Sequence, residues 1–492
     1  MDLVVGVDLA TAEVRAAAAD SEGRIHAEGA ADLPAPAGSR PGWYEQDAAT
    51  WWPATAEALR RVTDALGSDR DSVVAVSVCA TSGTVAAAAE DGTLGPGLTY
   101  ADQRATKEAA AAQAAGEPRW AGLGLRVQPT FGLPKWGWLV AHGTRVAALV
   151  HASDVVVSGL LGRPATEVPT DWSHALKSGY DPGTGEWATE ALAALGIDED
   201  QLPEVRPPGT AIGTVAGVGA ASTGLPSNCQ VVLGMTDACA SQLAAGAARP
   251  GRFVSVLGTT LVLKAVSQEP VADPAGAVYS HRHPLGWWLP GGASNTGGAA
   301  LRHGFSGRDL TALDQAAAGR GPARAVTYPL VGRGERFPFV APGAEAFLLG
   351  QPCDEVERYR SVLEGVAFVE RLGLDRMAAL GAPAEPPLAV TGRGSTSPVW
   401  NRIRATVASL PVEETPGATT TLGACILAAA GTLHPDLAAA TEAMAAAGKG
   451  ATVEPMAAEQ EAMDASYRRF TAEVTARGWL PADVEAVKPP RR

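Results

Sequence analysis

The stretch VVLGMTDACASQLAAGAARPGRFVSVLGTTLVLK, residues 231–264, decides the fold of this chain. It contains a Gly-Met-Thr-Asp turn that ends at Asp237. A strand follows, and Gly258-Thr259-Thr260 interrupts this strand. The first turn supplies a carboxylate. The second has the residues of an anion-binding turn, because turn amides donate hydrogen bonds to anions, Thr adds a hydroxyl and Gly lets the backbone approach closely. The stretch therefore predicts a carboxylate and a phosphate site in one unit.

A similar turn lies near the N-terminus, in the stretch VVGVDLATAEVR at residues 4–15. One constant offset aligns Thr11 with Thr260 and Arg15 with Lys264. Either segment alone is most simply an ordinary hairpin with Thr in its turn. Together they predict an internally duplicated chain, in which two similar domains hold a polyphosphate between their turns.

The two turns differ in one residue that can carry chemistry. Asp8 precedes the first turn, whereas the second turn has no acidic residue beside it. A carboxylate is a typical ligand of Mg²⁺, which keeps several water molecules when it binds phosphates. The asymmetry therefore predicts that Asp8 holds a magnesium ion through water.

Length and charge limit the classes of protein that fit. A chain of 492 residues can form two or three domains with cores of their own, and we expect domains over residues 1–248 and 249–492. The net charge of −14 and the pI near 5.1 argue against nonspecific binding to nucleic acid or to an anionic membrane, because both need clustered Lys and Arg. A nucleotide therefore has to be held locally.

Cysteine usage and hydropathy indicate the cytoplasm. The five cysteines are scattered and lack the spacing of metal ligands, which fits reduced thiols. The N-terminus lacks the basic start and the cleavage site of a signal peptide. No apolar run reaches the ~18 residues of a membrane span. We expect a cytoplasmic monomer or homodimer that binds neither nucleic acid nor membrane.

Strand and helix patterns alternate along the chain, which is typical of an α/β protein. Asp47 is the expected N-cap of a helix over residues 49–65, and a buried strand follows over residues 72–79. Apolar periodicity predicts further helices over residues 134–142 and 147–161.

Four segments in this order resemble those of the FGGY carbohydrate kinases: residues 8–11, 234–237, 258–260 and 392–400. The resemblance covers nearly the whole chain. It implies two ribonuclease H-like domains around a central cleft, the fold of the actin and hexokinase superfamily. Within the family, three further segments are similar to the D-ribulose kinases of plants and cyanobacteria: residues 174–181, 279–282 and 291–298.

The resemblance implies a reaction and a role for each matched residue. ATP, with Mg²⁺, would phosphorylate the terminal hydroxyl of a ketopentose, and Asp237 would be the general base that orients and deprotonates this hydroxyl. Asp8 would bind the metal. The sugar would contact Asp8, Ser82, Asp102 and Asp237, and ATP would contact Thr11, Gly258, Thr259, Thr260, Gly392, Gly394, Ser397 and Trp400.

Several of these residues also have a purely structural interpretation. Asp237 can cap a helix expected over residues 238–245, and Ser82 can be a simple turn residue. Asp102 lies close to Arg104 in the sequence, which allows a surface ion pair instead of a sugar contact. Trp400 can belong to the core rather than to the nucleotide site.

Alternatives also remain for the whole protein. D-ribulose is the first substrate that the resemblance implies, and D-xylulose, which differs at one stereocentre, is the nearest rival. A regulatory protein that binds a nucleotide or a sugar on the same fold is an alternative from another class, because a fold does not determine function. An actin-like ATPase would leave the sugar-side segments unexplained.

Overall fold

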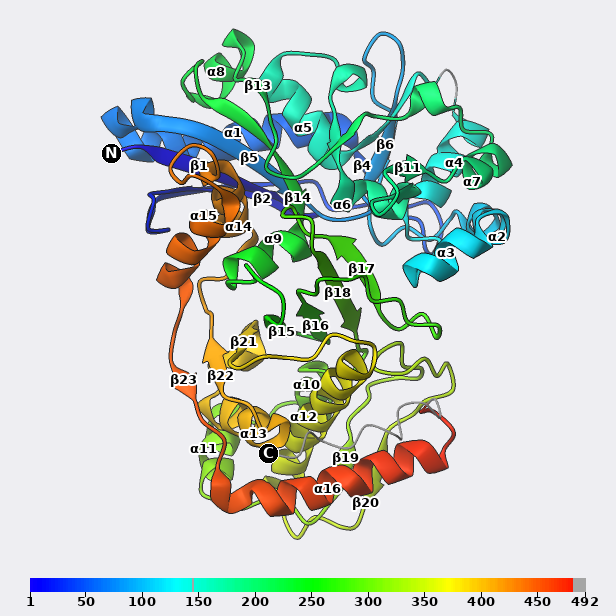
Figure 1. Ribbon diagram of the computed structural model, residues 1–492, viewed down its shortest axis with the longest axis vertical. Coiled ribbons are helices and arrows are strands. Elements are labelled where there is room, and N and C mark those ends of the chain that lie inside the picture. The colour runs from blue at the N-terminus through cyan, green and yellow to red at the C-terminus, as the bar shows by residue number, and fades with distance from the viewer. Residues whose placement is uncertain (144–145, 481–492) are drawn as a thin grey trace.

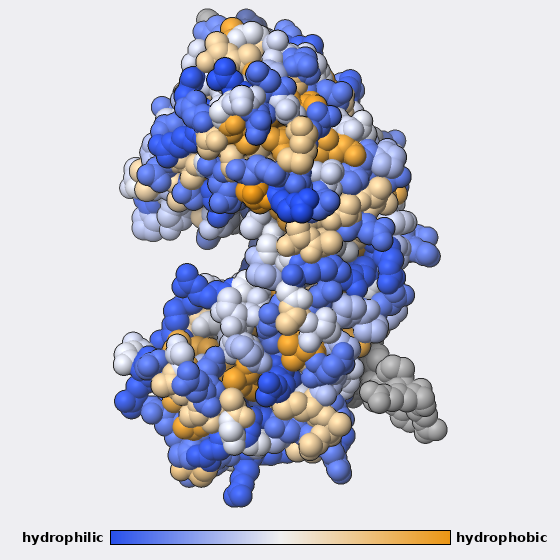
Figure 2. All heavy atoms as spheres, turned by 90° about the vertical axis from the view of Figure 1, so that its left-hand side faces the viewer, coloured by the Kyte–Doolittle hydropathy of each residue, from blue (hydrophilic) through white to orange (hydrophobic). Residues whose placement is uncertain are grey.

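The computed structural model describes residues 1–143 and 146–480. It consists of two lobes, which lie one above the other in Figure 1. Each lobe contains one mixed sheet with packed helices, and Figure 2 shows the molecule hollowed between the lobes. The predicted α/β class and the two-domain architecture around a cleft are confirmed.

The first lobe is built on a six-stranded sheet. β1 is parallel to β5 and β5 to β14, whereas β2 pairs antiparallel with both β1 and β3. Helices α1, α5 and α8 lie on one face, and α9, α14 and α15 on the other. The strands in spatial order are β13 (Ala211–Thr214), β14 (Gln230–Thr236), β5 (Val73–Ala80), β1 (Leu3–Leu9), β2 (Glu13–Ala19) and β3 (Ile25–Asp32), and the helices are α1 (Trp51–Leu66), α5 (Ala152–Leu161), α8 (Gly217–Thr223), α9 (Asp237–Ala244), α14 (Thr420–Ala429) and α15 (Leu437–Ala445).

The second lobe repeats this arrangement in a seven-stranded sheet. β15 pairs antiparallel with β16 and parallel with β21, as β1 does with β2 and β5. The strands in spatial order are β17 (Tyr279–Arg282), β18 (Trp288–Ala293), β16 (Leu261–Ala265), β15 (Phe253–Leu257), β21 (Leu388–Thr391), β22 (Val412–Glu414) and β23 (Thr452–Val453). A small ladder of β19 (Val326–Tyr328) and β20 (Phe347–Leu349) and the helices α10 (Ala299–Gly304), α11 (Leu310–Ala318), α12 (Glu355–Ala379), α13 (Pro398–Ala408) and α16 (Ala457–Ala476) complete the lobe.

The duplication predicted from the two turns is therefore present, but the residue alignment within the hairpins is wrong. Arg15 pairs with Asp8, next to the turn at residues 10–13. Lys264 pairs with Val254, several positions away from the turn at residues 258–260. The two turns differ in length, so one offset cannot align both strands of both hairpins.

A four-stranded sheet extends the first lobe, and one helix prediction is wrong there. Residues 148–151 form a strand, because pairing with the strand that begins at Val85 overrides their helical pattern; only the rest of the predicted helix, α5, is helical. The sheet contains β4 (Glu45–Asp47), β7 (Pro96–Leu98), β6 (Val85–Ala88) and β8 (Ala148–His151), and α2 (Thr106–Ala115), α3 (Glu117–Leu123), α4 (Gly132–His142) and α7 (Thr189–Leu195) pack against it. Beside it lie α6 (Trp172–Ala175) and the short ladders of β9 (Thr170–Asp171) with β12 (Val205–Arg206) and of β10 (Tyr180–Asp181) with β11 (Glu186–Trp187).

Helices α9 and α14 cross at the junction of the two lobes (Figure 1). A Cβ atom at Gly423 in α14 would lie 2.1 Å from the carbonyl oxygen of Ala240 in α9, so this close crossing needs glycine. The buried cluster around the crossing includes Val4 from the first sheet and Val254 from the second. One apolar core thus joins the two lobes.

The chain does not divide simply into two halves. All strands of the first sheet precede residue 248, but α14 and α15 come from the second half and pack on the first lobe. The expected boundary between residues 248 and 249 stays a prediction. Of the helices within the described residues, none is both long and apolar enough to cross a membrane.

Replacing Gly423 with Ala should lower the free energy of unfolding by about 1–3 kcal/mol, because the added methyl group forces α14 away from α9. Denaturant unfolding measures the change. Gly217→Ala in α8 is the control, since a Cβ at Gly217 would meet open space. If both variants were as stable as the parent protein, the close crossing would be contradicted.

Candidate active site

Asp237 lies where β14 ends and α9 begins, one residue before the predicted helix start. Its Oδ1 accepts a hydrogen bond from the Ala238 amide at 2.7 Å. Among the described residues, its Oδ2 has no hydrogen-bond partner. Thr236, and not Asp237, is the N-cap of α9, so the capping interpretation of Asp237 is wrong. The amides and the dipole of the helix N-terminus still stabilise a carboxylate at its first residue, and Oδ2 remains as a further acceptor.

Asp8 lies near the end of β1, and its two oxygens differ. Oδ2 accepts a hydrogen bond from Arg15 at 2.6 Å, while Oδ1 is buried without a partner among the described residues. Burial raises the pKa of Asp8 to about 6; Arg15 opposes the rise and Asp237 adds to it. A buried oxygen without a partner costs free energy, so a cation fits beside Asp8.

The Gly-Thr-Thr turn at residues 258–260 is held by the segment that follows β18. The Gly298 amide donates to the Gly258 carbonyl at 2.9 Å. A Cβ at Gly297 would lie 2.6 Å from Thr260 Cα, so glycine is needed for the two turns to pack together. The second hairpin turn and the start of α10 therefore form one unit. Thr11, in the first hairpin turn, accepts a hydrogen bond from Gln46 through its carbonyl oxygen.

Two of the predicted adenosine-side residues, Gly392 and Gly394, pack against Leu257, next to the Gly-Thr-Thr turn. Gly392 has a φ of 87°, and a Cβ there would lie 2.8 Å from the Leu257 carbonyl oxygen; a Cβ at Gly394 would lie 2.4 Å from the Leu257 side chain. Ser397 caps α13 by accepting the Trp400 amide at 3.1 Å. Trp400 itself is 3% exposed and belongs to the core of the second lobe. In this conformation Trp400 is therefore a core residue, as one of its two interpretations had it. Contacts between these residues and a nucleotide stay predictions.

A cavity of about 800 Å³ lies between the lobes, a volume suited to a small molecule. The first lobe contributes Ser82 and Lys177, and the second contributes Tyr279 and Gly292. Ser82 Oγ is buried and has no partner within the described part of the chain. A polar group of a bound ligand would satisfy it.

Lys177 is a site residue that the sequence alone did not single out. Its ammonium lies 5.5 Å from the ring centroid of Phe131 and 5.8 Å from that of Tyr279. Burial lowers the pKa of Lys177, but Tyr279 and Asp237 outweigh burial and raise it. The cavity therefore contains a cation whose field reaches Asp237.

Lys135 was also missed, and it fixes the walls of this cavity. It is fully buried in α4, and its three donors bond the carbonyl oxygens of Gly83 at 2.9 Å, Thr99 at 2.7 Å and Thr130 at 2.9 Å. Each carbonyl belongs to a loop that lines the cavity or borders a lining residue. The available signal was a lone Lys in the apolar stretch GLPKWGWLV.

Asp102 does form the ion pair with Arg104 that was one of its two interpretations, but the pair is buried. Arg104 donates to Asp102 Oδ2 at 2.7 Å, and the Tyr44 amide donates to the same oxygen at 2.6 Å. Both side chains are 0% exposed. Sugar binding by Asp102 stays a prediction, and the carboxylate already holds the Tyr44 segment beside the cavity.

These features define a class of protein. The two lobes share a strand order, and a cavity lies between them. A carboxylate stands at a strand-to-helix junction of the first lobe, and the second lobe has a turn rich in glycine and threonine. This combination is that of a kinase with the actin and hexokinase fold.

Comparison with known proteins gives the family. Residues 3–244 match the N-terminal domain of the FGGY family of carbohydrate kinases, and residues 253–432 match its C-terminal domain. A xylulose kinase of Streptomyces coelicolor is 30% identical over 421 residues, 84% of either chain. A ribulokinase of Mycolicibacterium smegmatis is 27% identical over 355 residues, 64% of this chain and 60% of the relative. The crystal structure of xylulose kinase from Rhodospirillum rubrum is similar with a TM-score of 0.85 at 25% identity, covering 97% of this chain and 99% of that one.

The chain belongs to the FGGY family of carbohydrate kinases, and it is a phosphotransferase that acts on a sugar.

Exchange of Asp237 for Asn should lower kcat by roughly 10²-fold or more, because the amide cannot take up the proton of the attacking hydroxyl. Steady-state kinetics measures kcat, and calorimetry with a non-hydrolysable ATP analogue should give near-normal binding. Asp309→Asn, at the cap of α11, is the matched control, since Asp309 also accepts amides of a helix N-terminus. Similar kcat values for the two variants would mean that Asp237 has only a structural role at the start of α9.

Removal of the Asp8 carboxylate in Asp8→Ala should raise the Mg²⁺ concentration needed for half-maximal rate and slow turnover, because charge on the phosphate oxygens is then less well neutralised. Mg²⁺ titration at saturating ATP measures this. Glu13→Gln removes a negative charge on the same hairpin and should leave the titration unchanged. Superimposable titrations of Asp8→Ala and the parent protein would show that Asp8 is structural.

Proposed function

We propose that this kinase transfers the γ-phosphate of ATP to the terminal hydroxyl of a five-carbon ketose, with D-ribulose as its first substrate. The observation that carries the proposal is the meeting of three sequence segments at one cavity. Lys177, Tyr279 and Gly292 come from the three segments that resemble the D-ribulose kinases, and all three line this cavity. Residues that are far apart in the chain thus line the same cavity.

The cavity offers the polar groups that a ketose needs. Ser82 Oγ has no partner among the described residues and is free to bond a sugar hydroxyl. The Lys177 ammonium donates to carbonyl or hydroxyl oxygens. Because a sugar hydroxyl in the wrong configuration leaves such buried groups unpaired, a site of this kind discriminates between stereoisomers.

Asp237 is the group proposed to activate the sugar. Its Oδ2 would accept the proton of the terminal hydroxyl as the hydroxyl oxygen forms a bond to the γ-phosphorus and the bond from this phosphorus to the bridging oxygen breaks, releasing ADP. Closure of the lobes would exclude water from the reaction. Thr11 and the turn at residues 258–260 would hold the phosphates through amides and hydroxyls.

Asp8 is the proposed ligand of Mg²⁺. The unpartnered, buried Oδ1 fits a hard cation, and the described residues contain no group of three or more His, Cys, Asp or Glu side chains that could hold a metal ion. Water and phosphate oxygens would therefore complete the coordination shell of the ion. When bound, Mg²⁺ neutralises charge on the phosphate oxygens.

D-xylulose is the second candidate substrate. The Streptomyces coelicolor relative is a xylulose kinase and is 30% identical to this chain. The same catalytic groups would serve either ketose, so the choice depends on which hydroxyl configuration satisfies the cavity.

The ratio of kcat/KM for the two ketoses tests the substrate. We expect D-ribulose to exceed D-xylulose by at least about tenfold, because a misplaced hydroxyl leaves buried partners unpaired. One enzyme preparation, assayed by ADP release with each sugar, gives both values, and a reaction without sugar corrects for ATP hydrolysis. Equal values or a preference for D-xylulose would overturn the assignment of D-ribulose and leave the kinase activity in place.

A further inference from the structure

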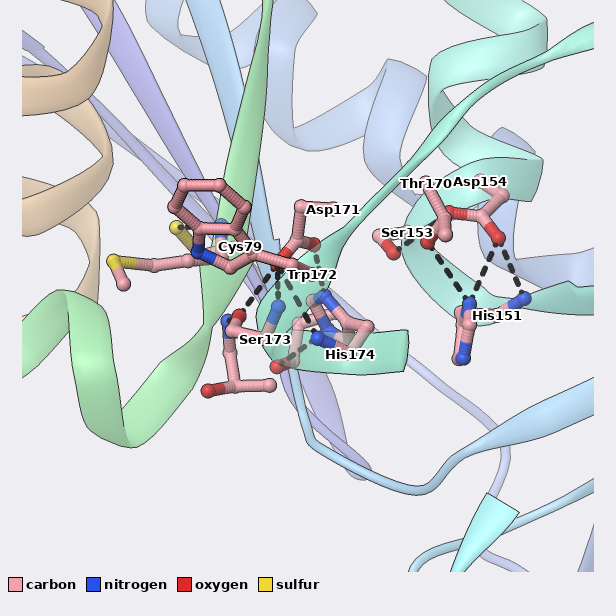
Figure 3. Close-up of polar contacts among 12 residues, drawn as sticks. Cys79, His151, Ser153, Asp154, Thr170, Asp171, Trp172, Ser173 and His174 are labelled. Carbon is pink, nitrogen blue, oxygen red and sulfur yellow. Dashed lines mark hydrogen bonds and ion pairs between the residues drawn. The ribbon is translucent and has the colours of Figure 1, made fainter. Parts of the chain in front are cut away.

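Figure 3 shows two buried His–Asp pairs in the first lobe, one at the start of α6 and one at the start of α5. In one, Asp171 contacts His174; in the other, Asp154 contacts His151 at 3.0 Å. The two imidazole rings lie 5.6 Å apart. The first pair is bonded to the end of β5 and, through Ser173, to the end of β14.

Asp171 organises the short helix α6, of which it is the N-cap. Its Oδ1 accepts the Ser173 amide at 2.8 Å and the Ser173 hydroxyl at 2.5 Å, while its Oδ2 contacts His174 Nδ1. All three side chains are buried. The carboxylate therefore fixes the orientation of both neighbours.

Ser173 connects Asp171 to the residue before Asp237. The Thr236 amide, immediately before Asp237, donates to Ser173 Oγ at 2.8 Å. The ladder between β14 and β5 shifts register between Leu233 and Thr236, and it resumes with Thr236 opposite Ala80. The serine hydroxyl thus bonds the amide of the last β14 residue, immediately before Asp237.

His174 connects Asp171 to the turn that contains Ser82. Its Nε2 donates to the carbonyl oxygen of Ala80, the last residue of β5, at 3.2 Å. Ser82 follows two residues later. The Asp171–His174 pair thus bonds the end of β5 directly and the end of β14 through Ser173. The proposed sugar-binding residue Ser82 and the proposed base Asp237 follow these two strand ends.

The contacts of His174 require a charged ring. Both ring nitrogens face acceptors, a carboxylate and a carbonyl, and a neutral imidazole has only one N–H. His283 shows the contrast, because one ring nitrogen faces the Ala247 carbonyl and the other accepts the Leu285 amide. Burial lowers the pKa of His283 to about 4; burial also lowers the pKa of His174, but Asp171 outweighs burial and raises it.

We propose that Asp171, Ser173 and His174 are positioning residues for phosphoryl transfer, in which an imidazolium–carboxylate pair holds the Asp237 junction and the Ser82 turn in register. This inference rests on the proposed function of Asp237 as the base. It adds a pH dependence, because loss of the His174 proton breaks one of its two hydrogen bonds.

The sign of this dependence follows from the raised pKa. The protonated ring is favoured in the folded protein, so the positioning is complete below the ordinary value of 6.5 and is lost as the pH rises through the raised pKa of His174. Asp154 also favours the charged ring. The other titratable or charged groups on elements packed around α6 are Lys177, Arg206, Tyr279, His281 and Arg282, with His151 and Cys79 nearby.

Two variants separate the bond from His174 to Ala80 from the bond between Ser173 and Thr236. His174→Gln removes the titrating group, so kcat should fall by roughly ten- to a hundredfold through misplacement of Asp237, and the alkaline fall in kcat due to His174 should disappear. Ser173→Ala cuts the link to Thr236 but keeps the pair, so kcat should fall while the alkaline limb remains. His283→Gln is the control for loss of a buried histidine and should change neither quantity. A His174→Gln variant with parental kcat, or with an unchanged alkaline limb, would overturn the proposal.

A measurement without substrate separates this inference from the proposed function. In protein labelled with ¹⁵N-histidine, NMR at neutral pH should show His174 with both ring nitrogens protonated and His283 with one, the signals being assigned from the two Gln variants. A neutral His174 ring would overturn the proposal even in an active kinase. Failure of the parent protein to phosphorylate any ketose would instead contradict the proposed function, and the NMR result would still stand.

Discussion

The close crossing of α9 and α14 is the contact on which the rest of the structure depends. Gly423 lets the backbones touch at Ala240, and the core around this point reaches into both sheets. α9 begins at Asp237 and α14 begins at Thr420, whose hydroxyl contacts that of Ser241 at 3.0 Å. The helix that begins at the proposed base is therefore packed tightly against α14, within the core that joins the two lobes.

Parallel pairing gathers the proposed chemistry at one edge of the first sheet. β1, β5 and β14 run in the same direction, so Asp8, Ser82 and Asp237, at or just beyond their ends, come together although they are far apart in the chain. Polar groups beneath this edge support it. Lys135 bonds three loops around the cavity, His174 bonds the end of β5, and Ser173, held by Asp171, bonds the end of β14. Burying such groups is favourable only when their hydrogen bonds are made. The site thus depends on a fully bonded polar layer as well as on the residues that face the ligand.

The sequence predicted those elements that depend on residues close together in the chain. The hairpins, the helix after Asp237 and the α/β class follow from turn chemistry and periodicity. The strand β8 was predicted as a helix, because its partner β6 is distant in the chain and gives no local signal. Lys135 was missed, and His174 was noted only as part of the segment 174–181, without a role of its own. The reason is the same for both: their side chains bond carbonyl groups of other loops. Trp400 lies in the core because α12 and α13 pack around it, which its spacing from Gly392 and Gly394 could not reveal.

The central claim is the transfer of phosphate to a terminal hydroxyl of a ketopentose. Phosphorus NMR of the purified protein with ATP, Mg²⁺ and D-ribulose tests it most directly, because the coupling of phosphorus to protons distinguishes a phosphorylated primary carbon from a secondary one. The account predicts a new phosphomonoester whose phosphorus couples to two equivalent or nearly equivalent protons, as on a primary carbon, together with ADP. A phosphomonoester coupled to a single proton, or ADP with inorganic phosphate and no sugar phosphate, would contradict it.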